Sequence, residues 1–276
     1  TLSAAGATAC RANESHRQQQ MVMTLLGQNT SPEIADALWK NRDMLLDAGR
    51  LPGQNLTATI LFSDIKDFSS SAEIHTPDTL LNWLNEYLDE MTQAIQHHHG
   101  IVNKFTGDGL MAVFGVPMGR TTEAEIAQDA QHAVLCALEM SDRLQMLNQQ
   151  WSAQGLPEWR IRIGIFTGKI IAGSLGGKSR MEYGVIGDSV NIASRLESCR
   201  KDFHPTPGRI LIAQETRQYL DDRFNIEDFG EMHLKGRSQQ VHVYHVLSGK
   251  GEVDHAIANA LPDPNFTKPS PNALKN

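Results

Sequence analysis

Two aspartates stand where a folded chain would expose them at the end of a sheet. Asp64 ends the apolar, β-forming run of residues 59–62, and Asp108 lies in the tight-turn sequence of residues 106–109. If the strands on either side pair in one sheet, the two carboxylates meet at its edge. Paired carboxylates suit Mg²⁺, a hard ion that takes oxygen ligands and shares its shell with substrate phosphates. Read singly, Asp64 is a helix cap and Asp108 a turn residue.

A second group of polar residues lies on a predicted helix over residues 188–199. Asn191 and Arg195 are four residues apart and therefore share one face of that helix. Asp188 or Ser189 can cap its start. An amide and a guanidinium on one face are good partners for a sugar hydroxyl and a phosphate. A salt bridge or a solvated face is the plainer alternative.

Two further features carry weaker signals. Lys235 lies in the link between the last two predicted strands, where a lone lysine is usually solvated. The histidines at 97–99 end a predicted helix, where imidazolium favours the negative end of the helix dipole. A metal site there is the less favoured alternative, since three consecutive residues do not converge on one ion.

Hydrophobic spacing predicts the elements that must position these residues. The predicted helices are 78–99, 123–151 and 188–199; the predicted strands are 56–62, 101–105, 110–116, 159–167, 210–213, 224–229 and 241–246, with a glycine-containing hairpin over 169–185. Strands that alternate with two long helices predict an α+β sandwich, in which one sheet carries helices on one face.

This body, residues 56–247, lies between two segments of different character. Within residues 1–55, apolar residues recur at three- and four-residue steps from Arg11 to Leu46, so we expect a linker of amphipathic helices, broken at Pro32. The sharper alternative is an element that couples an upstream sensor to the body. Residues 248–276 are rich in Pro, Asn and Lys, and we expect a disordered tail.

Composition excludes several classes of protein. The 276 residues carry a net charge of −7, which argues against bulk binding to nucleic acid or to an anionic membrane. Three scattered cysteines exclude a disulfide framework and a Cys-rich zinc site, and they indicate a reducing compartment, the cytosol. No apolar stretch approaches the ~20 residues that span a bilayer. The chain begins with Thr1, so we expect a piece of a longer protein that can be membrane-anchored elsewhere.

Four segments together resemble the class III nucleotidyl cyclase catalytic domain. In order they are LFSDI (61–65), FTGDG (105–109), GDSVNIASR (187–195) and LKG (234–236). Each is weak alone, but four in the right order and spacing are hard to obtain by chance. The resemblance covers about residues 56–247. It implies a ferredoxin-like βαββαβ core, with a mainly antiparallel sheet, that works as a head-to-tail homodimer with active sites at the interface.

The resemblance also implies roles for individual residues. Asp64 and Asp108 hold two Mg²⁺ ions, with the Ile65 carbonyl as a further ligand, and Mn²⁺ can substitute. One ion activates the ribose 3′-hydroxyl and the other holds the triphosphate. The partner chain supplies the remaining groups: Asn191 for the ribose, Arg195 for charge on the α-phosphate and Lys235 for the outer phosphates.

The turn after Asp64 is expected to offer backbone N–H groups to phosphates. It spans residues 66–69, including Phe68 and Ser69, at a helix start. The family usually has glycine where Asp67 stands, so a carboxylate is added near the triphosphate.

Two positions bear on the purine. Lys104 matches the place where adenylate cyclases carry Lys, which donates to adenine N1, and guanylate cyclases carry Glu. Gly184 matches a place where adenylate cyclases usually carry Asp or Thr and guanylate cyclases often carry a small residue. Gly184 therefore either does not discriminate between the purines or favours GTP. We give Lys104 more weight, since an ammonium facing guanine N1–H is repulsive, whereas water or backbone can replace a missing acceptor.

We therefore expect an enzyme that converts ATP to 3′,5′-cyclic AMP and pyrophosphate. A guanylate cyclase is the main alternative, and an inactive nucleotide-sensing homologue is a further one, although no metal Asp, Asn or Arg is substituted. A diguanylate cyclase lacks support because its Gly-Gly-Asp/Glu-Glu-Phe turn is absent. A polymerase palm leaves Asn191, Arg195 and Lys235 unexplained.

Overall fold

A computed structural model describes residues 52–249, except residues 118, 178, 179, 201, 204, 206 and 238. The helices predicted within residues 11–50 and the tail from residue 250 onward lie outside the described residues. The predicted boundaries of the body are each two residues too narrow, because the first strand begins at Gln54 and the last continues to Gly249.

One eight-stranded sheet forms the centre of the fold. Its order is β2-β3-β1-β4-β6-β8-β7, and β5 pairs with β4 off this path. Every neighbouring pair is antiparallel except β4 with β6. The strands are β1 (Gln54–Ile65), β2 (Ile101–Thr106), β3 (Gly109–Phe114), β4 (Ile161–Gly177), β5 (Arg180–Ile186), β6 (Gly208–Ala213), β7 (Phe224–Met232) and β8 (Val241–Gly249); the helices are α4 (Phe68–Ile74), α5 (Pro77–His97), α6 (Glu123–Ala153), α7 (Asp188–Ser198) and α8 (Gln214–Arg217).

The predicted ferredoxin-like core is present. Strands β2, β3, β1 and β4 lie side by side, with α5 inserted after β1 and α6 after β3. Both helices cover one face of the sheet, where their apolar stripes share a core with Leu61, Ile163 and Ile165. The expectation of helices on one face is therefore correct for this βαββαβ unit.

The opposite face carries α7, which that expectation did not include. Ile192 and Leu196 of α7 pack in a second core with Ile60 and Leu211. Ile60 and Leu61 point to opposite faces of β1 and both are fully buried, so the centre of the sheet needs cover on both sides. Gly164 of β4 lets α7 approach, because a Cβ there would lie 2.2 Å from the backbone N of Glu197.

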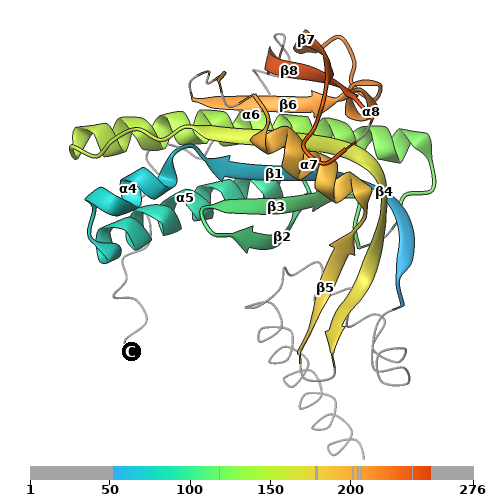
Figure 1. Cartoon of the computed structure of the whole chain (residues 1–276), viewed down its shortest axis with the longest axis horizontal. Coiled ribbons are helices and arrows are strands. Elements are labelled where there is room, and N and C mark those ends of the chain that lie inside the picture. Colours follow the sequence, from blue (N-terminus) through green and yellow to red (C-terminus); the bar gives the residue numbers. More distant parts are fainter. Residues whose placement is uncertain are drawn as a thin grey trace, which may run out of the picture.

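The hairpin expected over 169–185 is present, because the outer half of β4 pairs antiparallel with β5. The strand expected over 159–167 does not end before the hairpin but continues into its first half, which makes β4 one 17-residue strand. Gly168 lies within this strand and makes room for α7, because a Cβ there would lie 2.6 Å from Ser189 Oγ. The outer half of β4 and β5 project from the body as a two-stranded arm (Figure 1).

An aromatic cluster ties the helices to the start of β4. The rings of Trp83 and Trp159 stack with centroids 3.8 Å apart, and Trp151 meets both edge-on. Asn148 of α6 accepts from the backbone N–H of Trp159 at 2.9 Å and donates to its carbonyl at 2.8 Å. Phe68 of α4 packs on Trp159 with centroids 5.7 Å apart, which fixes the helix that follows Asp64.

Candidate active site

The structure brings the two predicted carboxylates together. Ser63 of β1 pairs with Leu110 of β3, so Asp64 reaches the β2–β3 turn that holds Asp108. Gly109 allows this approach, because a Cβ there would lie 2.5 Å from the Ser63 carbonyl and 3.3 Å from Asp64 Oδ1. The Asp64 side chain and the Ile65 backbone N–H both act on the Asp108 carboxyl: the first raises its pKa and the second lowers it.

Burial and like charge act together on Asp108. Its partial burial and then the neighbouring Asp64 carboxylate raise the pKa of Asp108 above its ordinary range. The Ile65 N–H opposes this shift but does not cancel it. Two carboxylates held so close form an all-oxygen, negatively charged pair, which is the donor set that a hard divalent cation prefers.

Arg162 is a member of this site that the sequence analysis missed. It lies on β4 directly opposite Asp64, and its guanidinium makes an ion pair with Asp64 Oδ2. Its Nε lies 3.0 Å from Glu197 Oε1 of α7. The alternation of Arg160 and Arg162 with isoleucines marks an outward-facing row of a strand, but only the pairing of β4 with β1 assigns Arg162 to Asp64.

The second cluster forms where the loop between β7 and β8 meets α7. Arg195 Nη2 lies 3.5 Å from the place of a Cβ on Gly236, the residue after the exposed Lys235. Arg237 Nη1 lies 2.5 Å from Asp188 Oδ2 and so fastens the loop to the start of α7. The structure therefore brings Arg195 and the Lys235 loop together, with Asn191 exposed one helical turn away.

The predicted cap of α7 is wrong. Gly187 is the N-cap residue, and no side chain caps the helix. Asp188 instead pairs with Arg237, and Ser189 Oγ donates to the carbonyl of Lys169 at 2.7 Å. Both side chains attach α7 to its neighbours, so they position the helix that carries Asn191.

The turn after Asp64 keeps its backbone shape despite the missing glycine. Asp67 has φ 57° and ψ 28°, a left-handed conformation that glycine adopts most easily. The carboxylate of Asp67 pairs with the ammonium of Lys66. The backbone N–H of Lys66 donates to the Arg160 carbonyl at 2.8 Å, so that amide is committed to the protein. Phosphate binding by the amides of Phe68 and Ser69 stays a prediction.

The two predicted purine positions lie on neighbouring elements. Lys104 is exposed on β2, and the residue before it, Asn103, donates from Nδ2 to the Tyr183 carbonyl of β5 at 3.1 Å. Gly184 follows Tyr183. The hydrogen bond therefore joins the strand of Lys104 to the arm that carries Gly184.

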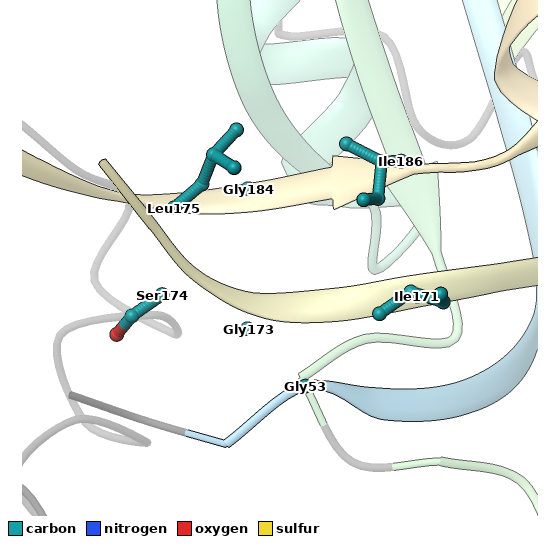
Figure 2. A pocket seen from close by; sticks show the side chains of 7 residues that line it. All are labelled: Gly53, Ile171, Gly173, Ser174, Leu175, Gly184 and Ile186. Carbon is teal, nitrogen blue, oxygen red and sulfur yellow. The ribbon is translucent and has the colours of Figure 1, made fainter. Parts of the chain in front are cut away.

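Gly184 is not the open position that the sequence suggested. It is buried on the arm, opposite Gly173 of β4. A Cβ on Gly184 would lie 2.6 Å from Cβ of Leu175, whose side chain takes up that space beside the strand (Figure 2). The surrounding pocket is lined by Gly53, Ile171, Gly173, Ser174, Leu175, Gly184 and Ile186. An apolar group thus occupies the place of the expected acceptor.

None of the helices in the described part of the chain is both long and apolar enough to cross a bilayer.

Known proteins match most of the described part of the chain in sequence and in fold. Residues 53–248 match the family model of the adenylate and guanylate cyclase catalytic domain. Adenylate cyclase 1 of Rhizobium meliloti is 35% identical over 189 residues, which are 68% of this chain and 27% of that protein. A terminal-differentiation-specific adenylate cyclase of Dictyostelium discoideum is 34% identical over 70% of this chain and 9% of its own length. The chain therefore spans a minor part of these relatives.

Two solved structures are similar to nearly the same degree. The adenylyl cyclase CyaB of P. aeruginosa has a TM-score of 0.66 and 36% identity, covering 72% of this chain and 98% of its own. The guanylyl cyclase Cya2 has a TM-score of 0.64 and 34% identity, covering 72% and 95%. Since one is an adenylyl and the other a guanylyl cyclase, overall likeness does not select the purine. With the carboxylate pair, the α7 cluster and the matched fold in place, the chain belongs to the family of adenylate and guanylate cyclase catalytic domains.

Proposed function

We propose that this domain converts ATP into 3′,5′-cyclic AMP and pyrophosphate for second-messenger signalling, by in-line attack of the ribose 3′-hydroxyl on the α-phosphate. The observation that carries the proposal is the partly buried, like-charged pair Asp64–Asp108 at the edge of the sheet. Such a pair is unfavourable by itself, and a divalent cation relieves it.

The carboxylates of Asp64 and Asp108 and the Ile65 carbonyl would hold two Mg²⁺, for which Mn²⁺ can substitute. When bound, these ions lower the pKa of the 3′-hydroxyl and neutralise charge on the triphosphate. Arg162 of β4 positions the Asp64 carboxylate, and Glu197 of α7 in turn holds the Arg162 guanidinium. The Ile65 N–H orients Asp108.

A second copy of the chain completes each site. Glu197 near the end of α7 contacts Arg162, the partner of Asp64, whereas α7 begins farther along β4, beside Lys169. Asn191 lies six residues before Glu197, so at ~1.5 Å per helical residue it is displaced from the carboxylates of its own chain by on the order of 10 Å. In a head-to-tail dimer, Asn191 orients the ribose, Arg195 stabilises charge on the α-phosphate and Lys235 binds the outer phosphates.

Lys104 favours ATP over GTP as the substrate. Its exposed ammonium can donate to adenine N1 but is repelled by the N1–H of guanine. A guanylate cyclase is the second candidate, because Gly184 has no acceptor for the adenine amino group and Leu175 supplies none.

Purine choice is tested by turnover of ATP and GTP side by side, with Mg²⁺ and with Mn²⁺. An unpaired donor or acceptor in a closed pocket costs ~1–3 kcal/mol, so we expect ATP to be favoured by ~10- to 200-fold. Lys104→Glu should erase this preference and raise GTP turnover. Lys169→Glu, the same charge change at an exposed lysine of β4, should keep it. A wild-type preference for GTP would establish the guanylate cyclase instead.

Site sharing is tested by mixing two inactive chains. Asp108→Ala removes a metal ligand and Arg195→Ala removes the partner's contribution, so each homodimer should be inactive. One of the two sites in a heterodimer is intact, and random mixing should therefore restore roughly a quarter of wild-type cyclisation. Mixed dimers, verified by two affinity tags, that show no activity would rule out sharing of these residues.

The carboxylate pair also predicts a stability effect in metal-free protein. Because the pKa of Asp108 is raised on folding, its charge opposes folding as the pH rises above ~3.9, the ordinary value for Asp. Asp108→Asn should therefore raise the melting temperature at pH 7, and the gain should vanish below about pH 4. Mg²⁺ should stabilise the wild type but not the variant. If the melting temperature of Asp108→Asn at pH 7 equals or falls below that of the wild type, the charge on Asp108 does not destabilise the fold.

A further inference from the structure

Side chains of types that bind metals cluster at the C-terminal end of α5, where the sequence favoured no metal site. His97 Nδ1 and His98 Nε2 both lie 2.8 Å from the same atom, Glu139 Oε2 of α6. Two of the three consecutive histidines therefore do converge. They do so because His98 is the C-cap of α5, where the backbone leaves the helix and turns this ring beside that of His97.

The carboxylate of Glu139 is fixed from its other side. Its side chain is fully buried, and Oε1 accepts from Arg143 Nε at 2.8 Å. Arg143 in turn donates from Nη1 to Glu90 of α5 at 2.7 Å. With neutral imidazoles, Glu139, Glu90 and Arg143 sum to one negative charge. A carboxylate that is oriented by a second partner, next to two ring nitrogens, is the usual setting of a ligand to a transition metal.

We propose that His97, His98 and Glu139 form a binding site for a divalent transition-metal ion of the Zn²⁺ type. The three donor atoms lie within 4.8 Å of one another. Zinc bonds of 2.0–2.1 Å in a tetrahedron place donors ~3.4 Å apart, so on binding each nitrogen–oxygen distance of 2.8 Å must lengthen by ~0.6 Å and the two nitrogens must approach by up to ~1.4 Å. Two nitrogens and one oxygen suit Zn²⁺, Co²⁺ or Ni²⁺ and not Mg²⁺. The His97 side chain is 45% exposed, which leaves an entry path and an open fourth position.

This cluster is separate from the carboxylate pair. Strand β2, of six residues, runs from the end of α5 to the turn that holds Asp108. That length separates the two sites by on the order of 20 Å. An ion at the cluster would fasten the C-terminal end of α5 to the middle of α6, beneath the strands that present the catalytic carboxylates.

The experiment uses the full 276-residue chain with the catalytic pair removed by Asp64→Asn and Asp108→Asn, after treatment with a chelator. Titration with Co²⁺ should produce the visible absorption of a tetrahedral site at one ion per chain, and Zn²⁺ should displace it. Adding His97→Gln and His98→Gln should weaken Co²⁺ binding at least ~10-fold. His99→Asn is the matched control: it removes the third histidine, whose φ of 60° asparagine tolerates, and should leave binding unchanged.

Melting curves verify that each variant is folded. His97→Gln alone, at an exposed side chain, replaces the double variant if the latter unfolds. Absence of the tetrahedral spectrum, or equal Co²⁺ binding after loss of His97 and His98, would overturn the site and leave these groups as a hydrogen-bonded helix end. In the otherwise wild-type chain, the His97→Gln, His98→Gln variant should keep its Mg²⁺-supported cyclisation within about two-fold. A failed metal site is thus distinguishable from a failed cyclase.

Discussion

Two negative charges that must lie side by side set the plan of this domain. Asp64 and Asp108 come from segments 44 residues apart, and the β1–β3 register and the bare Cα of Gly109 force them together. The chain balances part of this repulsion with Arg162, placed by the β1–β4 register. Partial burial and, second, the neighbouring Asp64 carboxylate raise the pKa of Asp108. Under the proposed metal assignment, a divalent cation bound between these carboxylates relieves their repulsion and so couples folding to metal binding.

The same sheet separates the two halves of the catalytic apparatus. Helices α5 and α6 cover one face and α7 the other, and β4 keeps the start of α7 far from the carboxylates of its own chain. Gly164 and Gly168 fix the height of α7 above the sheet, because larger residues would meet its backbone or Ser189. Under the proposed sharing of Asn191, Arg195 and Lys235 with a second copy, association of two copies is a condition of catalysis.

Residues that lie in short motifs could be singled out from the sequence, because the order and spacing of those motifs point to one family. The carboxylates, Asn191, Arg195 and Lys235 lie in short motifs. Strands alternating with two long helices predict the α+β sandwich, and the family resemblance implies its βαββαβ core. Features that depend on strand pairing stayed hidden. The role of Arg162 as the partner of Asp64 cannot be recognised before β4 is paired with β1. Likewise, the space beside Gly184 looks unoccupied until the hairpin places Leu175 there. The convergence of His97 and His98 on Glu139 likewise depends on where α5 ends and how it meets α6.

Cyclic nucleotide formation by purified, folded Asp64→Asn and Asp108→Asn chains is the most direct measurement of the metal assignment. Each substitution keeps the size of the side chain but removes a charge from the pair that binds the ions. Both should lose at least ~100-fold in turnover, with Mg²⁺ and with Mn²⁺, because several kcal/mol of transition-state stabilisation disappear. Near-normal turnover in either variant would contradict catalysis by metals bound to this pair.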